Sequence, residues 1–237
     1  MRFATLAALV SALAVSAWGC VASVAPPNSS MNSVESNPPR AIPEGQQALV
    51  LGGGCFWCIE VLFEELKGVT FVENGYAGGD KAGVTYREIG TGTTGHAEVI
   101  RIVYDPKVIT TEDLLRIFFT VHDPTTKDRQ GGDVGPQYRS VIFFENDADK
   151  VRALAIMEEI TKADIWERPL VTTLEPLKNY TRAEEYHQDY YAKYETATEA
   201  ERANMNAGYC NAVISPKVLK FREKFADRLK TSGAGSR

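Results

Sequence analysis

Two cysteines in the stretch Gly-Gly-Gly-Cys-Phe-Trp-Cys-Ile-Glu (52–60) are the residues best suited to chemistry in this chain. Cys55 and Cys58 stand three positions apart, so a helix would place both thiols on one face. Unpaired N–H groups at a helix start favour an anion, and we expect the pKa of Cys55 to fall below the ~8.5 of a free thiol. The alternative is a tight turn holding an inert cysteine. The pair of thiols favours redox chemistry.

Glu98 is the third candidate. It lies in an alternating segment (97–104) and shares a face with Ile100 and Ile102. If that face is buried, loss of solvent raises the pKa of the carboxyl and keeps a proton available at neutral pH. If the strand ends at Glu98, the carboxylate is solvated and has no such role. Both interpretations stay open at this stage.

A strand, a turn and a helix must position Cys55. The apolar residues 48–51 predict a buried strand, and three glycines follow. Apolar residues then recur at helical spacing until Lys67 and Gly68, which suit a helix end. Cys55 is therefore expected at or near the helix N-terminus.

The rest of the chain alternates strands and helices. The pattern predicts strands at 69–74, 97–104, 137–144 and 171–174, helices at 110–119, 148–161 and 181–194, a turn at 75–79, and loops at 84–95 and 122–135. Thr110 with Asp113 and Thr181 with Glu184 resemble capping pairs at the starts of two of these helices. The order β-α-β-β-α-β predicts an α+β two-layer sandwich with a ferredoxin-like core, extra helices and a C-terminal tail. Right-handed crossovers would put the two principal helices on one face.

The ends of the chain differ in character from its body. Residues 1–20 combine a positive start with a short apolar run (3–15) that is too short for a ~30 Å bilayer core, which indicates a secretory or lipoprotein signal. Either cleavage after Ala17 or lipid attachment at Cys20 fits. We expect an exported protein, periplasmic or extracytoplasmic, which a lipidated Cys20 would attach to a membrane.

The composition of residues 21–237 indicates a linker, a folded domain and a flexible C-terminal end. Residues 21–47 contain five prolines and no aromatic residue, which predicts a flexible Pro/Ser/Asn-rich linker. Residues 48–225 form the folded domain, and 226–237 a flexible end. The net charge of −5 and the lack of basic clusters argue against a nucleic-acid partner. Four cysteines are too few for a disulfide scaffold.

Several motifs in this body resemble the A-type peptide methionine sulfoxide reductases. The resemblance covers residues 49–225 and rests on six blocks: Gly-Cys-Phe-Trp (54–57), Gly-Tyr-Ala-Gly-Gly (75–79), Thr-Gly-His-Ala-Glu-Val (94–99), the block from His-Asp-Pro to Gln-Tyr-Arg-Ser (122–140), Ala-Glu-Glu-Tyr-His-Gln (183–188) and Gly-Tyr-Cys (208–210). It implies reduction of the S epimer of methionine sulfoxide, free or in proteins, and thus repair of oxidised proteins. It implies no cofactor and no metal.

The resemblance also implies roles for single residues. Cys55 would attack the sulfoxide sulfur and become a sulfenic acid, while Glu98 would protonate the oxygen. Tyr86 and Tyr138 would donate further hydrogen bonds to that oxygen, and Asp133 would organise the pocket through water. The aromatic residues that would hold the substrate methyl group are Phe56, Trp57 and Tyr209.

A second thiol must resolve the sulfenic acid, with a thioredoxin-like reductant restoring the enzyme. Cys210 matches the usual resolver of the family. Cys58 is a departure, because this position is usually small, and it offers a second resolver one helical turn from Cys55. The segment 197–206 looks longer than its family counterpart, which weakens the placement of Cys210. Pro136, where threonine is more usual, is a minor departure.

Two alternatives remain from the residues themselves. A Cys-x-x-Cys pair at a helix start also suits a general thiol-disulfide oxidoreductase, although nothing in that activity explains Glu98 or the glycine-rich loop. A zinc-binding module would use Cys55, Cys58 and a histidine. Structural zinc sites usually need two short-spaced ligand pairs, and only one is present.

Overall fold

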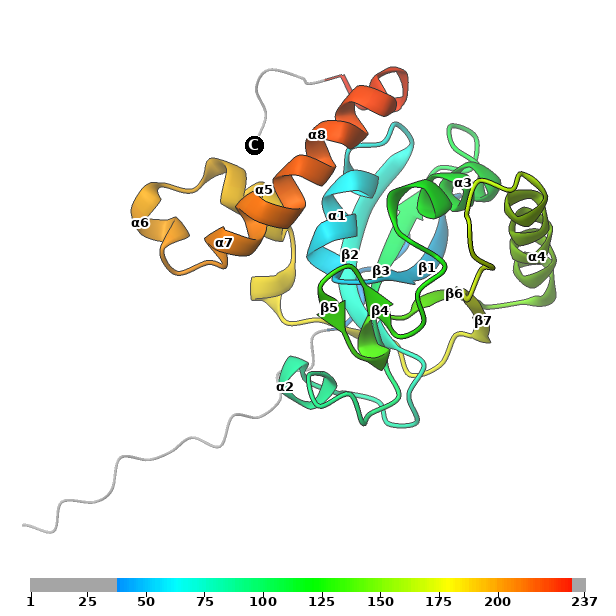
Figure 1. The fold of residues 1–237 in the computed structure, drawn as a ribbon, viewed down its shortest axis with the longest axis horizontal. Helices are drawn as coiled ribbons and strands as arrows, with labels where there is room; N and C mark the ends of the chain where they lie inside the picture. Colours follow the sequence, from blue (N-terminus) through cyan, green and yellow to red (C-terminus); the bar gives the residue numbers. More distant parts are fainter. Residues whose placement is uncertain (1–37, 232–237) are drawn as a thin grey trace, which may run out of the picture. The chain divides into compact units, whose positions relative to one another are not determined.

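A mixed six-stranded sheet is the centre of the structure, a computed structural model that describes residues 38–231. The strands are β1 Gln47–Gly53, β2 Val69–Ala77, β3 Ala97–Tyr104, β6 Ser140–Phe144, β7 Thr173–Pro176 and β8 Thr181–Arg182, with a separate hairpin of β4 Arg129–Gln130 and β5 Asp133–Val134. The helices are α1 Phe56–Glu64, α2 Tyr86–Ile89, α3 Thr111–Val121, α4 Asp147–Lys162, α5 Tyr190–Thr196, α6 Glu199–Arg202, α7 Ala207–Tyr209 and α8 Ser215–Lys224. The predicted α+β class is confirmed (Figure 1).

The sheet has the order β7-β6-β1-β3-β2-β8. Neighbouring strands are antiparallel except β6 and β7, which are parallel. The chain enters the sheet at β1, leaves through α1, and returns at β2 with β3 inserted between β1 and β2. The short glycine turn after β1 therefore emerges from the middle of the sheet.

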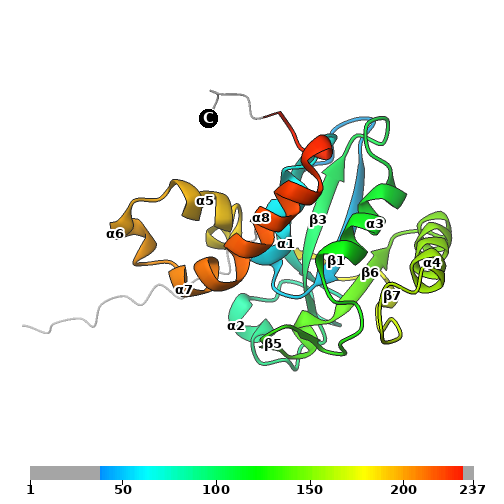
Figure 2. The ribbon, with the colours of Figure 1, turned by 45° about the horizontal axis from the view of Figure 1, so that its top comes forward.

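Alternation along the strands divides the apolar residues between the two faces of the sheet. Leu49 and Leu51 of β1 join the large core, which also contains the buried residues of α1, α3 and α8. Val50 points to the opposite face, into a small cluster that Leu177 and Tyr180 cover. Figure 2 shows α8 running alongside α1 next to the sheet. One face thus carries α1, which follows Cys55 and contains Cys58, together with α3 and α8.

The first helix is held at both ends by local geometry. Cys55 is its N-cap residue, as predicted, and the preceding Gly54 has a φ of +96°, which a residue without a Cβ adopts readily. The helix ends at Glu64, three residues earlier than the sequence suggests, because the turn is completed before Gly68 at φ +87°.

The helix α3 confirms its predicted cap. The Thr110 side chain accepts a hydrogen bond from the N–H of Asp113, and Leu114, Leu115 and Phe118 are buried on the inward face. The strand 97–104 and the helix α4 also lie where the pattern predicts them.

Several predicted elements are wrong in extent or kind. Residues 75–77, predicted as a turn, continue β2, and the predicted loop 84–95 contains α2. The strand predicted at 137–144 begins at Ser140 after a 3-10 turn, and the strand predicted at 171–174 lies at 173–176.

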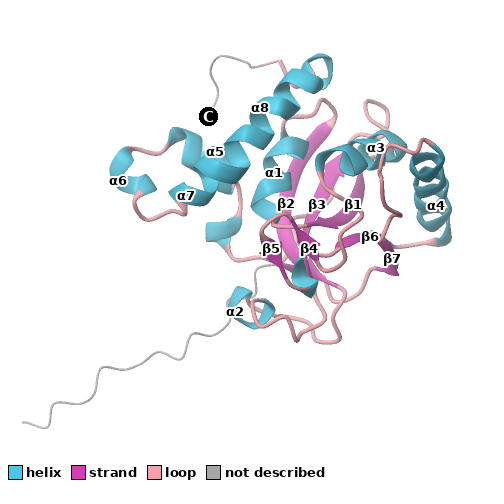
Figure 3. Cartoon of the chain, in the orientation of Figure 1, coloured by secondary structure: helices cyan, strands magenta, loops and turns pink. Residues whose placement is uncertain are grey.

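The helix predicted at 181–194 is wrong. Thr181 and Arg182 form β8, a 3-10 turn follows, and α5 begins only at Tyr190 (Figure 3). The carboxylate of Glu184, expected to cap this helix, instead accepts hydrogen bonds from the Tyr76 hydroxyl at 2.7 Å and the Tyr86 N–H at 2.9 Å. Tertiary contacts override the local capping signal.

The described residues near both termini make specific contacts. Arg40, within the predicted linker, places its guanidinium over the Phe71 ring at 3.9 Å and donates its N–H to Glu73. Residues 226–230, in the predicted flexible end, pair with the end of α1, where Leu229 bridges Leu66. The predicted signal (1–20), Cys20 and most of the linker lie outside the described residues. Within 38–231, no helix has the length and apolar character needed to cross a bilayer.

Candidate active site

The nucleophile candidate Cys55 lies in the turn between β1 and α1 and is 8 % exposed. The next N–H, that of Phe56, donates to Oε2 of Glu98 at 3.2 Å. The N–H of Cys58 closes the first turn on the Cys55 carbonyl at 3.0 Å. Gln130, from the β4–β5 hairpin, packs against Gly54. Three segments far apart in the sequence therefore meet at this thiol.

The electrostatic surroundings of Cys55 differ from the prediction. Burial raises the pKa of the Cys55 thiol well above its ordinary value, and contact with Cys58 raises it further. The helix N-terminus, which by itself would lower the pKa of Cys55, is outweighed here by the loss of solvent. The pKa of Cys58 is lowered, first because Cys55 hydrogen-bonds to it. Of the two thiols, Cys58 is therefore the one that ionises first.

Glu98 is buried, with 2 % of its surface exposed, so the solvated interpretation is wrong. Burial raises the pKa of Glu98 to about 8, and the charge of Asp133 acts in the same direction, while the hydrogen bond from Phe56 opposes them. At neutral pH the side chain is largely a carboxylic acid. Glu98 is thus a proton donor held beside the residue that follows Cys55.

A chain of hydrogen bonds connects Cys58 to the hairpin. The Tyr209 hydroxyl lies 3.1 Å from Sγ of Cys58 and donates to Oδ2 of Asp133 at 2.7 Å. Asp133 begins β5, at the tip of the loop that the sequence singled out, and Tyr209 ends α7. The predicted site residues Cys58, Asp133 and Tyr209 are therefore brought together directly.

Tyr86 and Tyr138 face the same site from α2 and from the turn before β6. Burial raises the pKa of Tyr86 to about 12, and the charges of Glu98 and Cys55 contribute. Burial likewise raises the pKa of Tyr138, again with contributions from Glu98 and Cys55. Both hydroxyls stay protonated over the physiological range and remain able to donate hydrogen bonds.

Aromatic rings form one wall of the site. The Trp57 indole is stacked on the Tyr190 ring, with centroids 3.8 Å apart and planes at 10°. The Tyr209 ring meets Trp57 edge-on at 6.5 Å, and Phe56 lies 6.1 Å from Trp57. Such a wall suits an apolar or sulfur-bearing substrate group.

Two members of this wall were not predicted. His187 packs between Tyr86 at 4.4 Å and Phe56 at 5.1 Å, and Tyr190 supports Trp57. Burial lowers the pKa of His187 to about 4, so its ring is neutral at physiological pH. The motif at 183–188 was a signal for this segment, but nothing local indicates that its ring meets the site.

Cys210 is fully buried at the start of a π-helical turn, Cys210–Ile214. Burial raises its pKa to about 11, with a contribution from the charge of Cys58. Cys55, Cys58 and Cys210 are all free thiols in this structure. A π-turn inside a helix often marks a functional position.

Within residues 38–231, one group of acidic side chains has metal-ligand spacing. It consists of Glu60, Glu64 and Asp189. The carboxylate of Glu60 already accepts the N–H groups of Asp189 and Tyr190, which gives it a structural task at the start of α5. The two thiols of α1 do not join a histidine in such a group in this part of the chain, which disfavours the zinc-binding alternative.

A model of the peptide methionine sulfoxide reductase family matches residues 47–229. The chain belongs to this family. The peptide methionine sulfoxide reductase MsrA of Halobacterium salinarum is 48% identical over 184 residues, which cover 78% of this chain and 98% of the relative. The relative of the same name from Deinococcus radiodurans is 42% identical over 206 residues, covering 87% of this chain and 95% of that protein.

Solved structures agree with this family assignment. Mxr1 from Saccharomyces cerevisiae, in reduced form, is 37% identical, has a TM-score of 0.63, and covers 70% of this chain and 95% of its own. Methionine sulfoxide reductase A of Corynebacterium diphtheriae is 33% identical with a TM-score of 0.57, covering 66% and 78%. The matched range of this peptide methionine sulfoxide reductase contains every site residue described above.

Proposed function

We propose that this enzyme reduces the S epimer of methionine sulfoxide, free or in proteins, to methionine and so repairs oxidised proteins. The observation that carries the proposal is the buried, protonated Glu98 bound to the N–H that follows Cys55. A nucleophilic sulfur and a carboxylic acid at neighbouring positions are what removal of oxygen from a sulfoxide requires. The family membership supports the same reaction.

The first step transfers oxygen from one sulfur to another. The sulfur of Cys55 attacks the sulfoxide sulfur, and the oxygen then passes to Cys55: a bond forms between the Cys55 sulfur and the oxygen as the S–O bond of the substrate breaks. The thiol proton ends on that oxygen, so Cys55 becomes a sulfenic acid and the substrate leaves as methionine. Glu98 protonates the oxygen, since an unprotonated oxide is a poor leaving group. Tyr86 and Tyr138 stabilise the charge on that oxygen by hydrogen bonding.

The aromatic wall accounts for substrate choice. We infer that Phe56, Trp57 and Tyr209 hold the S-methyl group, with Asp133 fixing the hydroxyl of Tyr209. With the methyl group held by the wall and the oxygen held by Glu98, one arrangement of methyl group, oxygen and main chain around the sulfur fits. This arrangement explains selection of a single epimer.

The second step forms a disulfide on Cys55. We propose that Cys58 or Cys210 attacks the sulfenic acid first and that the disulfide then moves to the pair that the reductant reaches. Cys58 shares the first turn of α1 with Cys55, which favours it as the first resolver. A thioredoxin-like protein is the proposed reductant, because a dithiol must restore both thiols.

A stereospecific assay tests the reaction. Each epimer of a methionine sulfoxide substrate is supplied with dithiothreitol, and methionine is measured. We expect turnover of the S epimer only, and turnover of neither epimer would refute the proposal. Cys55→Ser should be inactive, whereas Cys20→Ser, outside the folded domain, is the matched control and should keep full activity.

Thiol mapping after one turnover identifies the resolver. Cys58→Ser and Cys210→Ser are compared with the parent, and the disulfide is located by mass spectrometry. We expect a Cys55–Cys58 bond in Cys210→Ser and a Cys55–Cys210 bond in Cys58→Ser. Full turnover by both variants with a thioredoxin-type reductant would show that neither thiol is obligatory.

A general thiol-disulfide oxidoreductase remains the second candidate, favoured only by the Cys-x-x-Cys spacing. It gives no role to Glu98 or to the aromatic wall. Insulin reduction at thioredoxin-like rates, unaffected by Glu98→Gln, would favour it.

We further propose that residues 1–20 direct export, that 21–47 act as a linker, and that the enzyme works outside the cytoplasm. The charge and apolar pattern of the first residues support this proposal. Cys20 is the proposed lipid acceptor if cleavage precedes it. We also infer a ferredoxin-like core, supported by the order β6-β1-β3-β2 with antiparallel neighbours.

A further inference from the structure

The Tyr209 hydroxyl faces two groups that can carry negative charge but has one proton. It donates that proton to Asp133, so a thiolate at Cys58, 3.1 Å away, must compete with this carboxylate for the hydrogen bond. A thiolate at Cys58 therefore shares both its surroundings and this donor with a carboxylate. Such a pair of neighbouring anions needs a cation.

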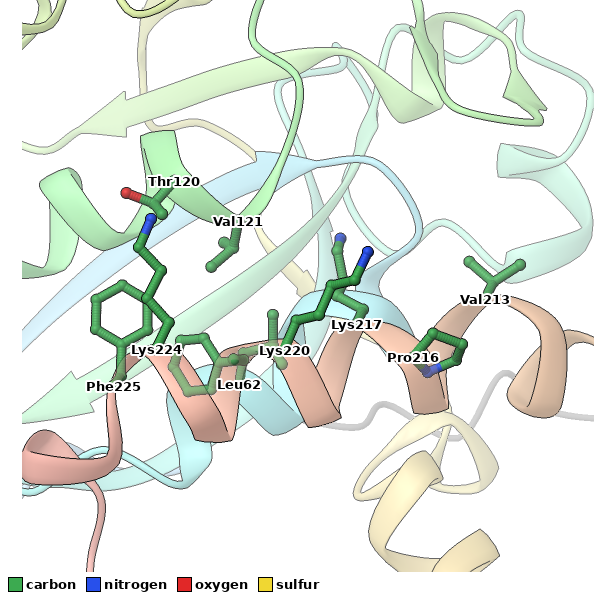
Figure 4. Close-up of a pocket in the computed structure, with 10 residues that line it drawn as sticks. Leu62, Thr120, Val121, Val213, Pro216, Lys217, Lys220, Lys224 and Phe225 are labelled. Atoms are coloured by element: carbon green, nitrogen blue, oxygen red, sulfur yellow. The ribbon is translucent and has the colours of Figure 1, made fainter.

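The helix α8 supplies one. A cavity of about 470 Å³ lies between α8, α1 and the end of α3, and Lys217, Leu62 and Val121 are among the residues that line it. Leu62 follows Cys58 by four residues on α1, so both side chains lie on the same face of that helix. Figure 4 shows Lys217 and Lys220 rising from α8 on the same side of the helix.

Within residues 38–231, Lys217 forms no salt bridge with a carboxylate, and the groups whose charges act on it are Cys58, Cys55 and Asp133. It is half-buried, whereas Lys220 and Lys224 on the same helix are exposed. A partly desolvated ammonium without a salt-bridge partner, whose charge interacts with those of two thiols and a carboxylate, is unexplained by packing alone.

We propose that Lys217 is a positioning residue for the resolving step, whose ammonium group keeps Cys58 in the thiolate form that attacks the Cys55 sulfenic acid. In that step the Cys58 sulfur forms a bond to the Cys55 sulfur and the S–O bond of the sulfenic acid breaks. The departing oxygen takes up a proton and leaves as water. No further oxidant or reductant is consumed. The inference rests on the proposed role of Cys58 as a resolver.

The charge of Lys217 matters most at the moment when Cys58 attacks the Cys55 sulfenic acid. At rest, the hydrogen bond from Cys55 is the main influence that lowers the pKa of Cys58, and the charge of Lys217 adds to it. Once Cys55 carries oxygen, its S–H group no longer exists and that hydrogen bond is lost. The charge of Lys217 remains. It therefore acts when Cys58 must be ionised.

Other titratable groups also influence the ionisation of Cys58 and Lys217, so they must be the same in the proteins that are compared. Those that act on Cys58 are Cys55 of α1, Tyr209 of α7, Asp133 of β5 and Lys217 of α8. The charge of Cys58 raises the pKa of Glu98 in β3, and the charge of Lys217 lowers the pKa of His122 at the end of α3. His122, with its pKa lowered to about 4 by burial, is neutral over the range of the experiment.

The pH dependence of Cys58 alkylation tests the inference. The full chain carrying Cys20→Ser, Cys55→Ser and Cys210→Ser leaves Cys58 as its single thiol, next to a residue that, like the sulfenic acid, lacks an S–H group. Iodoacetamide modification is followed by mass spectrometry. We expect Lys217→Met to raise the midpoint by about one pH unit, which slows modification about tenfold at pH 7. The rates should converge at high pH, where both proteins are fully ionised.

Matched variants separate charge from structure. Lys217→Arg keeps the charge and should keep the parental midpoint, whereas Lys217→Gln should behave like Lys217→Met. Lys220→Met removes an exposed lysine lining the same cavity and should have no effect. An unchanged midpoint in both Lys217→Met and Lys217→Gln would overturn the inference, as would an equal shift in Lys220→Met.

A second measurement keeps the two proposals distinguishable. In Cys210→Ser, formation of the Cys55–Cys58 disulfide after one equivalent of sulfoxide is followed at several pH values. When Lys217→Met is combined with Cys210→Ser, we expect the Cys55–Cys58 disulfide to form about tenfold more slowly at pH 7, while the rate of sulfenic acid formation stays unchanged. If the Cys210→Ser parent never forms this disulfide, the resolver role of Cys58 fails, and this inference with it. Normal closure that is insensitive to Lys217→Met overturns this inference alone.

Discussion

Replacement of Glu98 by glutamine is expected to make the enzyme slower and, at alkaline pH, more stable. Glutamine has nearly the same shape, and its side-chain oxygen can still accept the N–H of Phe56, the hydrogen bond that Glu98 makes at 3.2 Å. The change removes the acidic proton without removing the contact. Activity and stability should therefore move in opposite directions.

The size of both effects follows from the pKa of Glu98. With a pKa of about 8, about 90 % of the side chain is protonated at pH 7, against about 0.3 % for the ordinary value of 4.5. Loss of a positioned general acid slows a reaction by about 10²–10⁴. A carboxyl whose pKa rises from 4.5 to about 8 on folding contributes stability that is lost as pH rises through 8, up to about 4–5 kcal/mol.

Two measurements check this prediction. Sulfenic acid formation at pH 7 is followed by dimedone trapping in a background without Cys58 and Cys210, and urea unfolding is followed at pH 6 and pH 9. We expect Glu98→Gln to lose at least about a hundredfold in rate and to unfold at higher urea than the parent at pH 9. A rate within a few-fold of the parent would remove Glu98 from the mechanism. A parental stability that does not fall between pH 6 and pH 9 would show that the carboxyl is not held neutral.

Three further predictions concern the surroundings of the site. Gly54→Ala should destabilise the protein by about 1–3 kcal/mol in urea unfolding, because φ is +96° and the new Cβ would lie 2.5 Å from Cγ of Gln130. The pKa of His122 falls from 6.5 to about 4 on folding, so it should cost about 3 kcal/mol of stability as pH drops from 6.5 to 4, and unfolding of His122→Gln should lack this loss. Tyr209→Phe removes a hydrogen bond that lowers the pKa of Cys58, so alkylation of that thiol at pH 7 should slow by less than about tenfold; faster alkylation would contradict the assignment.

The sequence predicts the elements that local signals define. The strand before Cys55, the helix after it and the Thr110 cap follow from patterns within a dozen residues. The cap expected at Thr181 fails because its partner Glu184 is recruited by Tyr76, 108 residues away. A capping pattern in the sequence therefore fails to predict a helix start where a distant side chain binds the capping residue instead.

The same limit applies to the site. Resemblance identifies Cys55, Glu98 and the tyrosines, but the ionisation of the thiols depends on burial and on charges that only the fold brings close. The pKa of Cys55 is raised, not lowered, because solvent is excluded from the turn. Lys217 was missed because it lies 159 positions after Cys58 and no spacing rule connects them.

The pairing of residues 226–230 with the end of α1 has a consequence for how the enzyme is inactivated. The Lys230 N–H bonds the Glu65 carbonyl, and the Lys67 N–H bonds the Arg228 carbonyl. A protease that cuts after Phe225 would leave every catalytic side chain in place. It would still detach residues 226–230 from the end of α1, the helix that starts beside Cys55. Inactivation by such a cut would then begin at the far end of the chain rather than at the pocket.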